Sequence, residues 1–290
     1  MGSLRDIRKR IKTVKNTRQI TKAMKMVSAA KLRRAQDAVT ASRPFAQTID
    51  AVMAQIISRA EPGALSHPLL TTRAMKKVEI IVITSDRGLA GGFNANINRR
   101  AVKYLNEAKT DVGITTIGRK GNEFIRGRGF TVRRDWAGSL AKVRYATAEQ
   151  IAQEASKRFL DGEIDGVFLM FNEFGSVVSQ VPVTKQLLPF EAPKQTTNTQ
   201  AANTLIDFEY EPDAQSVLNK LVPQAVSIKI YGAMLESVAA EHAARMTAME
   251  NATRNAGDMI GSLTLFYNRS RQALITKELM EIVSGSEALK

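Results

Sequence analysis

The sequence predicts an α/β protein in which two long terminal helices form an antiparallel coiled coil and the middle forms a Rossmann-like domain with a mostly parallel sheet. Residues 3–43 contain no proline, and none occurs between Pro223 and Lys290, so both ends can form long helices. Between them, short β-branched runs alternate with helical patterns, as in a parallel sheet covered by helices.

The N-terminal helix is expected to occupy residues 1–60. Its first apolar residues repeat at coiled-coil spacing: Leu4, Ile7, Ile11 and Val14. Beyond them, a strict heptad would place mostly polar residues on the seam: Arg18, Thr21, Lys25 and Ser28. We therefore expect the apolar stripe to drift and resume at Met24 and Val27, as in a straighter helix. Pro44 could introduce a kink, and the helix should end near Arg59, before Pro62 and Gly63.

The C-terminal helix is expected within residues 212–290. A second seam follows 3–4 spacing along it: Met246, Met249, Thr253, Ala256, Ile260, Leu263, Tyr267, Ser270 and Leu274. About 60 residues would give a helix of roughly 90 Å, longer than one globular domain can cover. Such helices usually pair, so residues near Leu4–Val14 are expected to pack against residues near Leu263–Leu274.

The α/β domain is expected at residues 76–192. Its strands are predicted at residues 78–84, 112–117 and 166–171, with one or two antiparallel additions at residues 177–188. Helices are predicted near residues 101–108, 122–126 and 148–160. A loop and a further connecting segment, residues 193–211, complete the division of the chain.

Positive charge is concentrated at the N-terminus. Residues 1–34 carry twelve Lys and Arg against Asp6 alone, a net charge of +11 within a total of +14. Residues 224–290 are neutral, with seven residues of each sign. Such an imbalance favours an acidic partner: a nucleic acid, an anionic lipid or an acidic protein surface.

Catalytic and cofactor sites are not expected. The turn at residues 87–94 follows a strand and is rich in glycine, but it matches neither phosphate-binding pattern and has no lysine for a phosphate. Ser85 and Asp86 form the only suggestive catalytic pair, and Asp86 is expected to cap the turn or to pair with Arg87. The chain lacks cysteine, and its two histidines are too few for a typical metal site. We therefore predict no enzyme activity, cofactor or metal.

Four motifs resemble the γ subunit of rotary proton-translocating ATP synthases. They lie at residues 11–27 (IKTVKNTRQITKAMKMV), 85–94 (SDRGLAGGFN), 244–256 (ARMTAMENATRNA) and 267–285 (YNRSRQALITKELMEIVSG), in family order. Many relatives carry cysteine at the position of Ala90 and a Ser-Glu pair at Ala240-Glu241. The cysteine-bearing loop of plant-type members is missing, so a chloroplast origin is not expected.

The resemblance implies a non-catalytic central rotor that couples proton flow through a membrane ring to ATP synthesis or hydrolysis at the β subunits. Its implied partners are the α and β subunits, the ε subunit and the ring of c subunits, at the cytoplasmic face of the bacterial inner membrane. Family residues that contact β match Met24, Lys25, Arg271, Gln272, Thr276 and Glu278. Those that contact the ring and ε match Tyr210 and Glu211.

A nucleic-acid-binding protein remains the alternative. Its basic helix would lie along a phosphate backbone, which would account for the +11 segment. However, residues 1–34 contain no aromatic side chain for stacking and no evident base-reading set.

Overall fold

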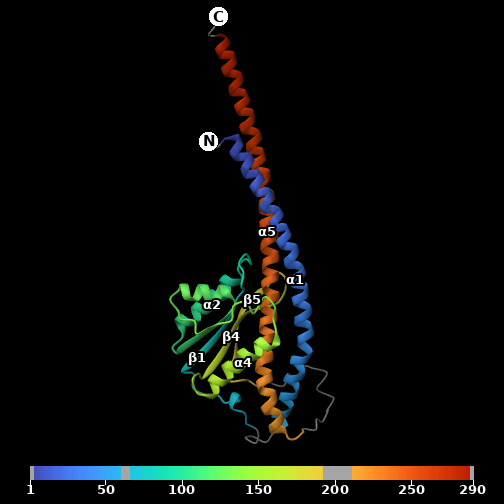
Figure 1. The fold of residues 1–290 in the computed structure, drawn as a ribbon, viewed down its shortest axis with the longest axis vertical. Coiled ribbons are helices and arrows are strands. Elements are labelled where there is room, and N and C mark those ends of the chain that lie inside the picture. Colours follow the sequence, from blue (N-terminus) through green and yellow to red (C-terminus); the bar gives the residue numbers. More distant parts are fainter. Residues whose placement is uncertain (1–2, 60–65, 192–210, 288–290) are drawn as a thin grey trace. The chain divides into compact units, whose positions relative to one another are not determined.

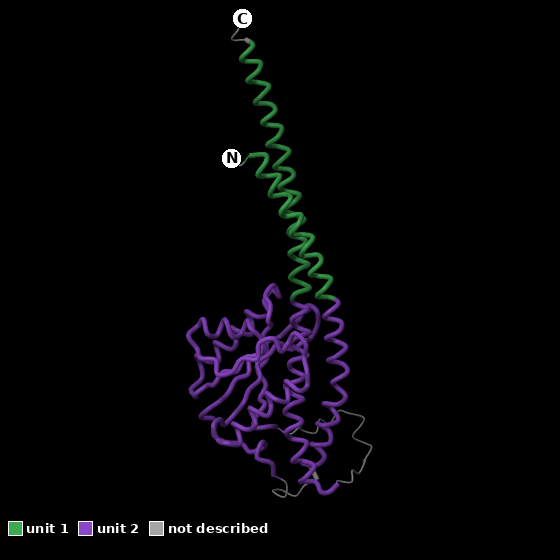
Figure 2. The backbone as a smooth tube through the Cα atoms, viewed as in Figure 1, with its two compact units in different colours: residues 1–29, 245–290 green, residues 30–244 purple. Residues whose placement is uncertain are grey.

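The computed structural model describes residues 3–59, 66–191 and 211–287 (Figure 1). They form two compact units (Figure 2). Unit 1 combines residues 1–29 with residues 245–290, and unit 2 comprises residues 30–244. Both long helices therefore contribute to both units. The division predicted from sequence follows helix and strand boundaries, whereas compactness divides each long helix in two.

The helices α1 (Leu4–Arg59) and α5 (Ala214–Glu287) match the two predicted terminal helices. Pro44 does not interrupt α1, and α1 ends at the predicted residue. The helix α5 begins nine residues before Pro223, because the Asp213 carboxylate accepts hydrogen bonds from the Ser216 N–H and hydroxyl. Leu218 and Val222 are fully buried and anchor this first part of α5.

The sheet has the order β3-β2-β1-β4-β5. Its strands are β1 (Lys77–Ile83), β2 (Asp111–Ile117), β3 (Arg134–Asp135), β4 (Gly166–Phe174) and β5 (Gln180–Leu188). The first four run parallel, and β5 pairs antiparallel with β4. The mixed, mostly parallel sheet was predicted; only the two-residue strand β3 was missed, since so short a strand leaves no periodic pattern.

Helices cover both faces of the sheet (Figure 1). The helices α2 (Phe93–Glu107) and α3 (Arg119–Gly127) pack on one face, where Ile80 and Val82 of β1 join Ile97 and Ile125. The opposite face receives α4 (Tyr145–Leu160), the 3₁₀ helix η1 (Pro68–Leu70) and the unit 2 parts of α1 and α5. Alternate residues of one buried strand thus serve two apolar cores.

A buried ion-pair network crosses the second face. Glu79 of β1 is 1% exposed, and its carboxylate bonds with the guanidinium groups of Arg133 and Arg158 and the hydroxyl of Thr115. Arg133 also pairs with Glu154 at 2.6 Å. Burial is the largest single effect and lowers the pKa of Arg133, but the hydrogen bonds and charges of Glu154 and Glu79 together raise it above its ordinary value. Because every charge has partners, the network is structural.

Candidate partner interface on the helix pair

The two helices of unit 1 run antiparallel. The contacts that join them include three between described side chains: Arg8 Nη2 donates to Tyr267 Oη at 2.6 Å, Thr253 Oγ1 donates to Thr21 Oγ1 at 2.8 Å, and Lys25 Nζ lies 2.8 Å from Glu250 Oε1. As the residue number rises along α1, that of its partner on α5 falls in step. The expected contact between residues near Leu4–Val14 and residues near Leu263–Leu274 is confirmed by the pair Arg8–Tyr267.

The seam on α5 is as predicted from Met246 to Ser270. All eight predicted residues in this stretch are buried or half-buried, whereas Leu274, the ninth, is 45% exposed. Antiparallel pairing explains the difference. Because Arg8 contacts Tyr267, the N-terminal end of α1, at Leu4, lies close to the level of Arg271. Beyond that level, the described part of α1 offers nothing to cover Leu274.

The seam on α1 differs from the prediction in its second half. Ile7, Thr21 and Ser28 are buried, so the strict heptad continues, whereas Val27 is 56% exposed and Met24 half-buried. Small polar side chains can occupy a helix seam when they find partners, and Thr21 does so by accepting from Thr253. The prediction of a drifting apolar stripe was therefore wrong at Val27.

A basic groove of about 770 Å³ lies between the two helices of unit 1. Its charged lining consists of five cations and one anion: Lys15, Arg18, Lys22, Lys25, Arg254 and Glu250. The hydrogen bond and charge of Lys25 lower the pKa of Glu250, so this carboxylate stays ionised at neutral pH. The ion pair with Glu250 keeps the Lys25 ammonium beside the groove. The other four cations have no further anion among the groove residues, so the groove carries a surplus of positive charge.

Four of the residues that the resemblance predicts to contact a β subunit lie on the end of α5 that α1 does not cover. Arg271, Gln272, Thr276 and Glu278 are all exposed. Within α5 itself, Thr276 Oγ1 donates to the Gln272 carbonyl oxygen at 2.9 Å. Every described residue from Arg271 to Ser286 is exposed, so this stretch offers its whole circumference to other molecules.

The same end of α5 carries an apolar signal that the sequence analysis missed. Six large apolar side chains on it are 45–68% exposed: Leu274, Ile275, Leu279, Met280, Ile282 and Val283. At about 100° per residue they spread around most of the helix rather than along one stripe. A helix that is apolar on most sides is usually enclosed. The spacing of these six residues can be read from the sequence. That α1 does not cover them follows only from the structure, where the seam between the helices ends near Ser270.

The other predicted contact residues are less informative. Glu211 is exposed and lies in a bend just before α5, while Tyr210 lies outside the described residues. The predicted loop at residues 193–203 also lies outside them.

Ser85 and Asp86 both form hydrogen bonds that stabilise the fold. Ser85 is fully buried and donates to the carbonyl oxygen of Arg87. The Asp86 Oδ1 accepts from the N–H groups of Arg119 and Gly138 at 3.1 and 2.9 Å, joining the turns that follow β1, β2 and β3. Asp86 therefore links neighbouring turns through their backbone N–H groups, where the sequence predicted a cap of its own turn or a pair with Arg87.

The glycine-rich turn at residues 87–94 packs against α5. Ala90 and Phe93 form a small apolar cluster with Ala240 and Ala244, and Phe174 packs against it. The turn therefore serves helix packing at the sheet edge where α/β proteins often bind nucleotides.

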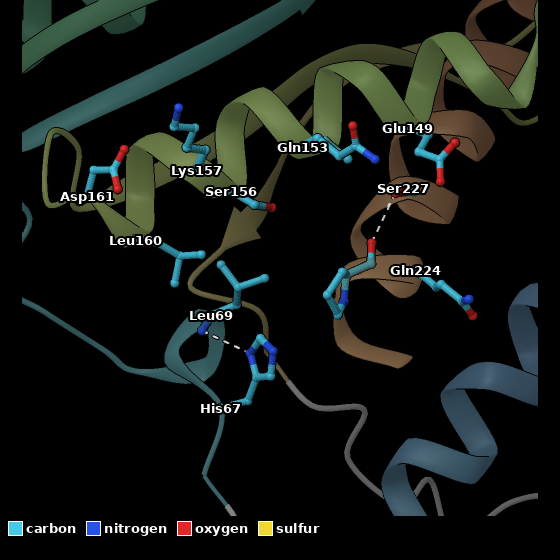
Figure 3. Close-up of a pocket in the computed structure, with 12 residues that line it drawn as sticks. His67, Leu69, Glu149, Gln153, Ser156, Lys157, Leu160, Asp161, Gln224 and Ser227 are labelled. Carbon is cyan, nitrogen blue, oxygen red and sulfur yellow. Dashed lines mark hydrogen bonds between the residues drawn. The ribbon is translucent and has the colours of Figure 1, made fainter. Parts of the chain in front are cut away.

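A second cavity, of about 360 Å³, lies between α4, η1 and the start of α5 (Figure 3). Its histidine, His67, accepts a bond from the Leu69 N–H at Nδ1, capping η1. Burial lowers the pKa of His67, so the imidazole is neutral at physiological pH. Among the residues that the structure describes, no cluster of three His, Asp or Glu could hold a metal ion.

These features define an assembly protein: an α/β domain whose helices continue into a pair with one uncovered, apolar helix end. The family model described as ATP synthase matches residues 3–289. The chain is 55% identical to the ATP synthase gamma chain of Anaeromyxobacter sp. (strain Fw109-5) and 46% identical to that of Pelotomaculum thermopropionicum, each over the full length of both chains. It therefore belongs to the ATP synthase gamma-chain family and is a central-stalk rotor subunit, non-catalytic by itself.

Solved structures agree. A chain from the central stalk and c-ring of the Tetrahymena thermophila mitochondrial ATP synthase is 28% identical, with a TM-score of 0.60, over 80% of this chain and 99% of that one. A chain of the Euglena gracilis mitochondrial enzyme in rotational state 3 has a TM-score of 0.66 at 20% identity, over 99% and 94% of the two chains, and supports the fold alone. No helix among the described residues is long and apolar enough to cross a bilayer.

Proposed function

We propose that this chain turns inside a hexamer of α and β subunits, with the uncovered end of α5 as its bearing and Arg271, Gln272, Thr276 and Glu278 as its grip on β. The apolar, exposed circumference of α5 beyond Ser270 carries the proposal. Burying those side chains in a surrounding sleeve would be favourable at about 25 cal/mol per Å². Arg271, Gln272, Thr276 and Glu278 would then contact different β subunits as the helix turns, because they lie on particular sides of it.

The basic groove would meet an acidic surface of β. Met24 and Lys25 lie half-buried on α1, at the level where Lys25 pairs with Glu250. Both side chains of this ion pair are about two-fifths exposed (38% and 44%), and such a pair contributes little by itself, so Lys25 can exchange partners at small cost as the shaft turns. Long-range attraction from the surplus cations would persist in every orientation, because it depends on net charge rather than on fixed pairs.

The further partners would be the ε subunit and the c-subunit ring, contacted near Tyr210 and Glu211. Through that ring the chain would be peripheral to the cytoplasmic face of a bacterial inner membrane. Proton flow would turn ring and shaft together, and the asymmetric surface of the helix pair would move each β site through its binding states.

The test is the double variant Arg271→Ala with Gln272→Ala. Its matched control is Asn268→Ala with Arg269→Ala, the preceding exposed amide and arginine on the same helix. A charge-assisted hydrogen bond in a desolvated interface contributes about 1.5–3 kcal/mol, so ATP turnover per assembled complex should fall by about tenfold or more in the first variant alone.

Assembly yield is measured first by size-exclusion chromatography, and turnover second. The melting temperature of the isolated chain should be the same in both variants, since neither pair is buried. Wild-type turnover in a correctly assembled Arg271/Gln272 variant would show that these residues do not form the grip.

A further inference from the structure

A second basic region lies outside the helix pair. Residues 93–134 contain ten Lys and Arg against three Asp and Glu, a net charge of +7. This stretch includes α2 and α3, which together cover one face of the sheet. The net charge of the whole chain does not reveal this basic region, because acidic residues elsewhere in the middle of the sequence offset its positive charge.

Six cations of this region point to solvent. They are Arg99, Arg100, Lys109, Arg119, Arg126 and Arg128, here called the basic face. Within the described parts of the chain, none of the six forms an ion pair with a carboxylate, whereas Lys103, Lys120, Arg133 and Arg134 do. Arg100 instead donates to Thr184 Oγ1, and Arg126 to Asn122 Oδ1. Their positive charge is therefore not neutralised within the described chain.

The opposite face of the sheet offers an internal comparison. The helix α4 carries Glu149 and Glu154 against Lys157 and Arg158, a neutral balance. A charge surplus is thus a property of the α2–α3 layer and not of every outer helix of unit 2. A solvated helix face that served only solubility would be expected to mix the two signs.

The basic face lacks the apolar centre of a protein–protein interface. No large apolar residue between Phe93 and Arg134 is exposed, although others are elsewhere in the described chain. The aromatic rings of the layer are partly buried: Tyr104, Phe124 and Phe130 pack on the core beneath it. Without exposed rings, stacking on nucleic-acid bases is also unavailable.

We propose that the basic face binds the anionic phospholipid headgroups of a bilayer surface. Five of its six cations are arginines, whose planar guanidinium groups match phosphate oxygens bidentately. A face that is charged but not apolar would attract the headgroups electrostatically without inserting into the hydrocarbon. The proposal rests on the proposed function only in placing the chain near a membrane; the contact itself would be direct.

The test uses the full chain in a background that reduces the charge of α1: Lys9→Gln, Lys12→Gln and Lys22→Gln. Into it we introduce either Arg99→Gln, Arg119→Gln and Arg126→Gln, or the control set Lys142→Gln, Lys157→Gln and Lys220→Gln. The control removes three exposed cations from other parts of unit 2, so both variants have the same net charge. Binding is measured by co-sedimentation with phosphatidylcholine vesicles with and without one-third phosphatidylglycerol.

Each basic side chain near an anionic bilayer contributes roughly a fivefold gain in partitioning, so the basic-face variant should bind phosphatidylglycerol vesicles about 100-fold more weakly than its background. The control set should change binding by about twofold at most, and pure phosphatidylcholine should bind none of the proteins. Equal losses in the two variants, or no loss in either, would overturn the proposal. So would a variant that keeps vesicle binding but loses affinity for a short DNA duplex, which would point to nucleic acid. None of these outcomes depends on assembly with α and β subunits, so failure of the rotor proposal remains distinguishable.

Discussion

Thr84, at the end of β1, is held by two glycines of the next strand–helix turn. Its Oγ1 accepts from the Gly121 N–H at 2.7 Å and donates to the Gly118 carbonyl oxygen at 3.1 Å. Gly118 has φ +100, and a Cβ there would lie 2.0 Å from the Thr84 carbonyl oxygen. The turn between β2 and α3 is therefore filled by a threonine side chain and by close backbone packing.

Gly118→Ala should destabilise unit 2 strongly, because it combines a strained φ with a backbone clash. We expect a loss of about 2–4 kcal/mol in the free energy of unfolding, measured with urea. Gly127→Ala, at the end of the same helix, is the control: a Cβ there meets nothing within 4 Å, and the change should stay within about 1 kcal/mol. Equal losses would show that the close approach to Thr84 is not the cause.

Two carboxylates should give stability opposite dependences on pH. Burial raises the pKa of Glu236, with Lys185, Glu173 and Arg43 as its charged neighbours, and one of its oxygens, Oε2, has no partner among the described residues. Backbone N–H groups of Lys77 and Lys76 lower the pKa of Asp165. The folded state thus binds a proton more tightly at Glu236 and less tightly at Asp165 than the unfolded state does.

The Glu236 contribution favours folding in acid and is lost as the pH rises through its raised pKa. Glu236→Gln should therefore be more stable than wild type at pH 8 and lose that advantage near pH 4. The Asp165 contribution is present above the ordinary pKa and is lost as the pH falls through the lowered one, so Asp165→Asn should be less stable at pH 8, with the gap closing in acid. Urea unfolding at several pH values measures both, and parallel curves for the two variants would refute these assignments.

At the scale of elements, the periodicity of the sequence predicted the helix seam on α5. It did not predict which residues are buried through contacts with a distant helix. The seam from Met246 to Ser270 was legible because 3–4 spacing is a local property. The burial of Thr21 could not be predicted from α1 alone, since its hydroxyl is satisfied by Thr253, a residue far away in sequence. The same holds for the uncovered end of α5, which is defined by where its partner helix stops.

Cysteine cross-linking tests this pairing directly. The pair Thr21→Cys with Thr253→Cys should form a disulfide readily, because the two hydroxyl oxygens lie 2.8 Å apart and the chain has no other cysteine. The control pair, Val27→Cys with Met246→Cys, lies at one level of the helix pair but places one thiol on an exposed position of α1, so it should not cross-link. Non-reducing electrophoresis after mild oxidation distinguishes them. A cross-link in the control alone would restore the drifting stripe expected from sequence.

At the scale of the whole molecule, each long helix belongs to two units with different cores. In unit 2, α1 buries Leu32, Val39, Ile49, Met53 and Ile56, and the last three join the core formed with the sheet, α4 and α5. In unit 1, its described residues bury only Ile7, Thr21 and Ser28, two of them polar. Little apolar surface therefore opposes local separation of the helix pair in unit 1, which suits a segment completed by a surrounding partner.

Amide hydrogen exchange should follow this division. In the free chain, residues 4–29 and 245–287 are expected to exchange at least about tenfold faster than residues 30–57 and 214–244, because separating two helices that bury few side chains fully costs less than exposing a packed core. On assembly with α and β subunits, protection should rise in unit 1 and change little in the helical parts of unit 2. Mass spectrometry of peptic fragments measures exchange in the free chain and in the complex. The boundary near Ala29 and Arg245 lies inside the continuous helices α1 and α5, so helix propensity alone cannot produce it. Uniform protection along α1 in the free chain would contradict the division, and unchanged protection of unit 1 in the assembled complex would contradict the sleeve.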